Sequence, residues 1–259
     1  MTGSTFPPFG MFNTEAHIIH SSCANQDFQI GVWFPFSYAG SPERKFPVLY
    51  VPDGEFSFPV AAGLIPTLMG EGEVPEMLVV GIAYHGIQDW GEFGILRDRD
   101  YCIQQFLPPS KPTRHAEYTQ FYKEELFPFI ESHYHADPQE RAVFGFSGAG
   151  FFAMHMLLTQ PGMFRRAAAA SCTWPGAGEY LLACAENYAA NPTPADAFLG
   201  VGANDAGQVD GFQRLADTLG RCPSLRFSSQ VFSGEGHSAG VIAQTFLQGV
   251  KAVFRPAAG

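Results

Sequence analysis

Short apolar runs bounded by Gly, Pro or Asp recur along this sequence and limit its fold more than any other feature. Four of them span residues 46–51, 77–83, 142–146 and 197–201. Runs of this length without polar alternation are typical of strands that are buried on both faces. Residues 167–171 could add another strand, although their four alanines fit a helix equally well. The runs therefore predict a sheet that is covered on both sides.

Patterns typical of helices separate these runs. Apolar residues recur at spacings of three and four in residues 118–134, 148–159, 212–219 and 239–254. Strands that alternate with helices predict an α/β fold with a mainly parallel sheet and helices on both faces. Two earlier segments, 15–21 and 28–34, carry β-branched and aromatic residues and are joined by the polar stretch 23–27. They predict an antiparallel hairpin at the N-terminal end of the sheet.

Size and charge narrow the class of protein further. A length of 259 residues and a hydrophobic content of 46% suit one α/β domain over residues 1–259. The net charge of −10 argues against nucleic acid or an anionic membrane as a partner. Residues 1–10 lack the pattern of a signal peptide, and no apolar stretch reaches the ~18 residues of a membrane span. We therefore expect a cytoplasmic protein without a nucleic-acid or membrane partner.

Residues 85–114 form the one long stretch without clear periodicity. Loops of this length inside compact domains are usually functional or disordered. The stretch contains Trp90, Phe93, Tyr101 and Phe106. Because aromatic residues disfavour disorder, we expect an ordered wall or lid, with a plain surface loop as the alternative.

Residues 141–150, RAVFGFSGAG, bring a buried run directly against the start of a helical pattern. Ser147 lies at this junction, where a strained turn from strand to helix needs small neighbours. The small residues beside it are Gly145, Gly148, Ala149 and Gly150. The N–H of Gly148 would open the helix, where free N–H groups and the helix dipole favour negative charge. The segment therefore predicts a nucleophilic serine with an oxyanion donor at Gly148.

This segment departs by one methyl group from the G-x-S-x-G pattern of such turns, because Ala149 stands at the second glycine. Alanine still fits a tight turn. The alternative is that Ser147 only caps the helix, which is a common role for serine in a Gly-rich turn. Whether the chain also supplies an acid and a histidine helps to decide between these two roles.

An acid and a histidine follow Ser147 in the chain order that serine hydrolases of this topology use. Asp205 comes just after the run 197–201, and His237 lies between a predicted strand, 225–232, and the last helix. Both fall in loops at the carboxyl edge of the sheet, where open α/β sheets bind ligands. A serine hydroxyl needs a neutral imidazole to accept its proton, and the imidazole needs a carboxylate to fix its tautomer.

Two other acids compete for the role of Asp205. Asp210 lies five residues further on, and Glu235 lies two residues before His237. We prefer Asp205 because it follows the strand most closely.

The remaining chemistry-bearing residues carry no strong motif. His133, His135 and Asp137 lack the spacing of helical metal ligands, so we expect no metal site. The five cysteines are widely spaced, odd in number and without a C-x-x-C pair. This pattern predicts reduced thiols rather than disulfides or a zinc site.

An ordered series of short motifs resembles the putative-esterase family of α/β hydrolases, which includes esterase D, feruloyl esterase domains and catecholate-siderophore esterases. The motifs lie at residues 48–54 (VLYVPDG), 97–101 (RDRDY), 127–131 (FPFIE), 141–150, 202–205 (GAND) and 236–237 (GH). Each motif is weak alone, but together they span most of the chain from about residue 46.

The resemblance implies the α/β-hydrolase fold and a role for each matching residue. It implies Ser147 as nucleophile, His237 as base and Asp205 as acid. It further implies a second oxyanion donor after Asp53 and Gly54, at the backbone of Glu55 or Phe56, and a loop near the site that Arg97 and Asp100 shape.

Substrate-binding candidates are less well defined than the catalytic ones. Trp90 and Trp174 fall near predicted strand ends and could line an acyl or aryl pocket, although a core position is equally compatible with them. Arg97 could attract a negatively charged substrate in spite of the acidic net charge.

Together these features predict a carboxylic ester hydrolase that acts on a small-molecule ester and uses no metal or organic cofactor. An acyltransferase would use the same three residues, with an alcohol or thiol in place of water. A binding protein that keeps the fold without catalysis is the alternative from another class.

Overall fold

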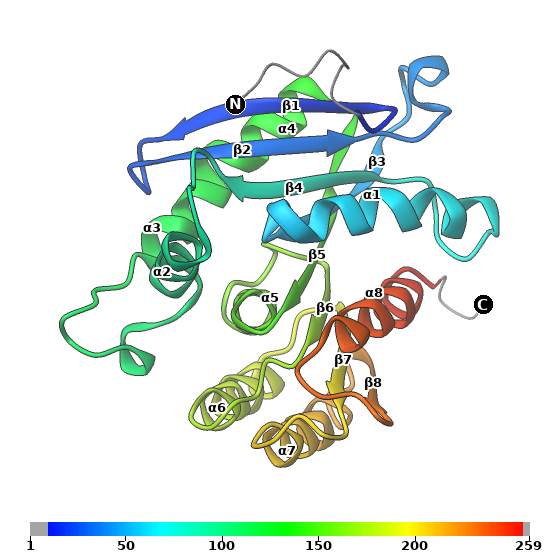
Figure 1. The fold of residues 1–259 in the computed structure, drawn as a ribbon. Coiled ribbons are helices and arrows are strands. Elements are labelled where there is room, and N and C mark those ends of the chain that lie inside the picture. Colours follow the sequence, from blue (N-terminus) through cyan, green and yellow to red (C-terminus); the bar gives the residue numbers. More distant parts are fainter. Residues whose placement is uncertain (1–9, 256–259) are drawn as a thin grey trace.

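A computed structural model describes residues 10–255, and one eight-stranded sheet runs through it in the order β1-β2-β4-β3-β5-β6-β7-β8 (Figure 1). The strands are β1 Thr14–Ser21, β2 Gln26–Trp33, β3 Phe46–Pro52, β4 Leu78–Tyr84, β5 Ala136–Phe146, β6 Arg166–Ala170, β7 Ala195–Gly202 and β8 Leu225–Phe232. β1 pairs with β2 and β2 with β4 in antiparallel fashion, whereas every other pair is parallel. The predicted parallel sheet with an N-terminal antiparallel hairpin is thus confirmed, and residues 166–170 form a strand rather than a helix.

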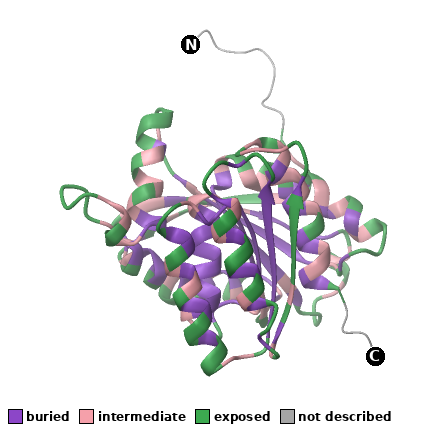
Figure 2. Ribbon diagram, turned by 90° about the horizontal axis from the view of Figure 1, so that it is seen from below, coloured by how far each residue is buried: buried purple, intermediate pink, exposed green. Residues whose placement is uncertain are grey.

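Helices cover both faces of this sheet, as its buried strands require. They are α1 Gly54–Gly70, α2 Trp90–Tyr101, α3 His115–Gln120, α4 Phe127–His133, α5 Gly148–Thr159, α6 Ala177–Ala190, α7 Val209–Leu219 and α8 Ala239–Phe254. α1 and α8 pack on one face, and α3 to α7 pack on the other (Figure 1). Most buried residues belong to the strands and to the helix sides that face them (Figure 2).

Three helices are not predicted by the sequence patterns. α1 contains Pro59 and Pro66, which lack the N–H of a regular helix and hide its periodicity. α2 lies inside the stretch 85–114 and buries only Phe93, Asp100 and Tyr101, too few for an apolar stripe. α6 buries residues at helical spacing, but several of them are small, among them Ala177, Gly178 and Ala185, so its apolar stripe is faint in the sequence.

The predicted helix 118–134 is interrupted. Its first part is α3, its last part is α4, and a π-helical turn, Phe121–Leu126, joins them. Pro128 lies in the first turn of α4 and cannot donate a hydrogen bond to the preceding turn. The π-helical turn just before Pro128 changes the hydrogen-bond spacing from α-helical to π-helical, which accommodates the N–H that proline lacks.

A charged cluster closes the amino edge of the sheet. Asp196, buried at the start of β7, lies 2.9 Å from Nε of Arg226 and 3.1 Å from Nη1 of Arg165. Arg226 and Arg166 also donate to the carbonyl of Val253 at the end of α8. The cluster thereby fixes the last helix to the sheet, on the edge opposite to the loops that carry Ser147, Asp205 and His237.

Two further observations concern the described residues as a whole. None of the helices within residues 10–255 is both long enough and apolar enough to cross a membrane. All five cysteines are free thiols, of which Cys23 is partly exposed and the other four are buried.

Candidate active site

Ser147 occupies a strained turn between β5 and α5. Its backbone has φ 56° and ψ −121°, a conformation that L-residues rarely adopt. The N–H of Ser147 donates to the Ala170 carbonyl at 2.8 Å, and its own carbonyl accepts from the N–H of Phe151 at 2.8 Å. Strain of this kind costs on the order of 1–3 kcal/mol and is concentrated at functional sites.

The residues beside Ser147 are small because larger side chains would collide with the backbone nearby. A Cβ added to Gly145 would lie 2.2 Å from the Ala149 carbonyl oxygen, and one on Gly150 would lie 2.9 Å from the Ala170 carbonyl oxygen. Strand and helix thus approach each other over these two glycines. Ala149 is fully buried, and its methyl group fits where the usual pattern has a second glycine.

His237 and Asp205 meet at the carboxyl edge of the sheet. Nδ1 of His237 lies 3.0 Å from Oδ2 of Asp205. Asp205 is buried, at 5% exposure, while the side chain of His237 is 42% exposed. The His237 ring packs on the ring of Phe146, the residue before Ser147, with centroids 4.5 Å apart. The N–H of Asn204 donates to the carbonyl of Glu235 at 2.7 Å and so joins the two loops.

Gln208, which the sequence patterns do not single out, completes the surroundings of Asp205. Its Oε1 accepts from the N–H of Thr173 at 2.9 Å, which turns its Nε2 toward Asp205 Oδ1 at 3.3 Å. Gln208 Nε2 also lies 3.1 Å from Nδ1 of His237. Nδ1 of His237 thus faces both an acceptor, Asp205 Oδ2, and a donor, Gln208 Nε2. Because a hydrogen bond to the charged carboxylate is the stronger of the two, Nδ1–H pairs with Asp205, which leaves Nε2 able to accept a proton. In the sequence, Gln208 is marked only by standing three residues after Asp205.

The competing acids have other surroundings. Asp210 is exposed in the first turn of α7. The carboxylate of Glu235 accepts from Ser238 Oγ at 2.6 Å and from Gln244 Nε2 at 3.1 Å, so it is engaged at the start of α8.

Three backbone groups are candidates for an oxyanion hole near Ser147. The N–H of Gly148 opens α5. The N–H of Phe56 already donates to the Asp53 carbonyl at 3.0 Å, whereas Glu55 stands one residue closer to the start of α1. Of the two residues expected at the second position, Glu55 is therefore the one whose N–H precedes the first hydrogen-bonded turn. Within the described residues, no hydrogen bond joins Ser147 Oγ to His237, and such bonds are often long before substrate binds.

The Glu55 side chain is also held in place. One oxygen accepts from the N–H of Tyr84 at 2.6 Å, while the other is buried without a partner. Burial raises the pKa of the Glu55 carboxyl above its ordinary value. The first turn of α1 is thereby fixed to the end of β4.

Arg97 and Asp53 form a two-bond ion pair beside Ser147. Nε and Nη2 of Arg97 lie 2.6 and 2.8 Å from the two carboxylate oxygens of Asp53. Nη2 of Arg97 also lies 3.5 Å from the carbonyl of Phe146. The backbone N–H of Asp53 donates to the hydroxyl oxygen of Tyr101 at 3.1 Å. Arg97, expected from the sequence at the substrate, is thus bound to Asp53 and is only 21% exposed.

The neighbouring residue Asp100 turns away from this pair. It is fully buried, and its carboxylate accepts two hydrogen bonds from Arg99, at 2.7 and 2.8 Å. The motif 97–101 therefore contributes two separate ion pairs to the wall that α2 forms.

Aromatic side chains gather where α1 and α2 begin. The exposed rings of Phe56 and Trp90 stack with centroids 4.7 Å apart, and Phe93 lies edge-on to both. Trp90 is 72% exposed and Phe56 45%. Trp174 instead packs edge-on against Phe106, so the two expected tryptophans lie in different clusters.

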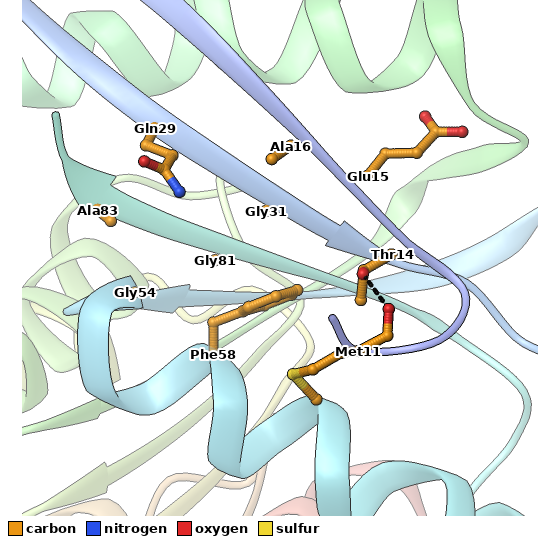
Figure 3. Close-up of a pocket in the computed structure, with 10 residues that line it drawn as sticks. All are labelled: Met11, Thr14, Glu15, Ala16, Gln29, Gly31, Gly54, Phe58, Gly81 and Ala83. Carbon is orange, nitrogen blue, oxygen red and sulfur yellow. Dashed lines mark hydrogen bonds between the residues drawn. The ribbon is translucent and has the colours of Figure 1, made fainter. Parts of the chain in front are cut away.

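A hollow of about 220 Å³ lies between α1 and the antiparallel end of the sheet (Figure 3). The ring of Phe58 extends from α1 over Gly31 and Gly81, where added Cβ atoms would come within 2.9 and 2.6 Å of ring atoms. The hollow reaches Gly54 at the start of α1, but Ser147, Asp205 and His237 do not line it.

The remaining histidines make contacts of their own. His133 stacks on Phe129 and His135 on Tyr38, so these two face different partners. His115 Nε2 and His155 Nδ1 lie 3.0 Å apart in the interior. Burial lowers the pKa of His155 to about 3 and also lowers that of His115.

Comparisons with known proteins show the family to which this chain belongs. Residues 21–212 match the family described as "Putative esterase". The chain is 26% identical to the ferri-bacillibactin esterase BesA of Bacillus subtilis (strain 168) over 261 residues, which cover 91% of this chain and 88% of that protein.

Solved structures with the same fold cover almost the whole chain. A BES protein from Bacillus cereus superimposes with a TM-score of 0.84 at 22% identity, covering 99% of this chain and all of the other. The siderophore hydrolase EstB from Aspergillus nidulans gives a TM-score of 0.79 at 17% identity, covering 98% of this chain and 100% of the other. The chain therefore belongs to the putative-esterase family, has the α/β-hydrolase fold and is a carboxylic ester hydrolase.

Proposed function

We propose that this esterase is a serine hydrolase with Ser147 as nucleophile, His237 as general base and Asp205 as the acid that orients His237. The observation that carries the proposal is the strained backbone of Ser147 at the end of β5, with the 3.0 Å contact between His237 and Asp205 at the same edge of the sheet. The N–H groups of Gly148 and Glu55 are the proposed oxyanion donors.

The proposed reaction has two steps. Ser147 Oγ attacks the ester carbonyl carbon while Nε2 of His237 takes its proton, and the oxyanion forms near the backbone donors. The tetrahedral intermediate then expels the alcohol, which takes the proton from His237, and leaves an acyl group on Ser147. Water attacks this acyl-enzyme, again giving its proton to His237, and the carboxylic acid leaves as Ser147 is regenerated.

Labelling with a fluorophosphonate probe tests the nucleophile. We expect the wild-type protein to be labelled and to lose esterase activity, and Ser147→Ala to be neither labelled nor active. Ser171→Ala is a matched control, because Ser171 also follows a strand and has a positive φ, 47°. Labelling that persists in Ser147→Ala would exclude Ser147 as the nucleophile.

We further propose a siderophore ester as the substrate. Support comes from the names of similar proteins, a ferri-bacillibactin esterase and two siderophore hydrolases. The exposed pair of Phe56 and Trp90 could stack on a flat aromatic group. Measuring kcat/KM for a ferric siderophore ester, a feruloyl ester and a short-chain p-nitrophenyl ester tests this, and preference for either of the last two would contradict it.

An acyltransferase remains the alternative for the same residues. Adding an acceptor alcohol during turnover distinguishes the two reactions. A hydrolase gives the free acid as its main product, whereas a transferase gives the new ester.

A further inference from the structure

We propose that Arg97 is a positioning residue for the oxyanion hole: it neutralises Asp53 and holds the Asp53 carboxylate away from the N–H groups that open α1. The proposal rests on the function proposed above, since it concerns the donors beside Ser147. It assigns Arg97 to the enzyme's own backbone rather than to the substrate.

Asp53 has an unusual conformation for the residue that precedes a helix. This residue stands at the N-cap position of α1, where an aspartate side chain normally accepts a hydrogen bond from the helix N–H groups. Here it makes no such bond. Its backbone is left-handed, with φ 56° and ψ 43°, and both carboxylate oxygens accept from Arg97 instead. The Asp53 side chain therefore leaves the first N–H groups of α1 uncapped, although the Asp53 carbonyl accepts from those of Phe56 and Ser57.

The guanidinium group of Arg97 lies close to the turns that precede both helices. Arg97 lies between the rings of Phe93 and Tyr101, with its central carbon 5.4 and 5.5 Å from the two centroids. A Cβ added to Gly148 would lie 3.8 Å from Nη2 of Arg97. The same nitrogen lies 3.5 Å from the Phe146 carbonyl. Arg97 thus contacts the residues just before α1 and just before α5. The two proposed donors, Glu55 and Gly148, lie in the first turns of these helices.

The charge of Asp53 bears directly on the proposed oxyanion hole. An oxyanion that forms between the N–H groups of Gly148 and Glu55 would lie near the carboxylate of Asp53, two residues before Glu55. An unpaired negative charge there would oppose the oxyanion, and the positive charge of Arg97 offsets it.

Direct binding of a substrate anion by Arg97 is the competing interpretation, and the two make different kinetic predictions. An arginine that binds an anionic group affects KM for anionic esters and spares neutral ones. An arginine that protects the oxyanion hole affects kcat for both kinds of ester, because the oxyanion forms in either case.

The test compares Arg97→Gln, Asp53→Asn and the double variant on p-nitrophenyl acetate and on an ester with a carboxylate group. For Arg97→Gln, we expect kcat to fall by about tenfold to a hundredfold on both esters, below the roughly 100- to 1,000-fold typical of a lost donor, with KM little changed. Asp53→Asn keeps the left-handed backbone accessible and should lose less. The double variant should be several-fold faster than Arg97→Gln, because the unpaired carboxylate is gone.

Several results would overturn the proposal. These are an increase in KM confined to the anionic ester, an unchanged kcat in Arg97→Gln, or a double variant slower than Arg97→Gln. If Arg97→Gln does not fold, Asp53→Asn is compared with the double variant. Because Arg97 is proposed to act through Asp53, the kcat values of these two variants must differ by less than about threefold, and a larger difference would contradict the proposal. Fluorophosphonate labelling of Ser147→Ala separates this proposal from the proposed function: retained labelling refutes the nucleophile, whereas lost labelling with normal Arg97→Gln kinetics refutes only the role of Arg97.

Discussion

Replacing Gly145 by alanine tests whether the tight approach of β5 and α5 sets the position of Ser147. The new Cβ would lie 2.2 Å from the Ala149 carbonyl oxygen, about 1.2 Å short of the 3.4 Å at which ordinary contact begins. Both groups at this contact are backbone, so the turn itself must move. A shift of about 1 Å at a reacting group costs about 100-fold in rate, and overpacking costs about 1–3 kcal/mol of stability.

The assay is kcat/KM on a p-nitrophenyl ester, together with urea unfolding followed by circular dichroism. Ala149→Gly is the matched control, because it restores the usual motif and removes only a methyl group that fits. It should lose about 1 kcal/mol of helix stability and keep most of its activity. A Gly145→Ala variant with wild-type kcat/KM would refute the reasoning, because it would mean that the turn has room for a side chain.

Three further predictions concern the acid, the interior histidines and the amino edge of the sheet. In steady-state assays, Asp205→Asn should lower kcat by about three to four orders of magnitude. Asp210 is exposed, so Asp210→Asn should leave kcat unchanged. The opposite result would identify Asp210 as the catalytic acid. Burial lowers the pKa of His155 from 6.5 to about 3. As the pH falls below 6.5, His155 therefore takes up a proton in the unfolded chain before it does so in the folded protein. The free energy of unfolding should fall between pH 6.5 and pH 3, by up to about 1.4 kcal/mol per pH unit. Urea unfolding at pH 7, 5 and 4 should show a shallower loss in His155→Gln, and equal slopes would contradict this. Asp196→Ala should cost about 1–3 kcal/mol of unfolding free energy without changing kcat, because it removes a buried hydrogen-bonded carboxylate from partly exposed arginines far from the site; a drop in kcat at full folding would contradict it.

The parallel strands could be predicted because a strand that is buried on both faces is apolar at nearly every position, which gives a continuous apolar run in the sequence. The antiparallel hairpin and the parallel strands appear where the apolar runs indicate them. α2 could not, since few of its side chains face the core and its hydrogen bonds to Asp53 connect residues 44 positions apart. Contacts over such distances depend on the whole fold and not on a local pattern.

The candidate site shows the same division. Ser147, Asp205 and His237 stand out because each follows a strand and because their order in the chain is informative. Gln208 does not, since a glutamine in a turn has no special pattern until the chain is folded. The ion pair of Arg97 with Asp53 likewise depends on two loops that meet only in three dimensions.

The charged cluster around Asp196 has a consequence for engineering this protein. β7 runs from Ala195 to Gly202, so Asp196 and the loop that carries Asp205 are separated by about 20 Å of strand. Substitutions at sites so far apart generally act independently. Libraries that vary the loops at the carboxyl edge can therefore change substrate range without loosening the attachment of α8, and stabilising changes at the amino edge can be added afterwards without readjusting the site.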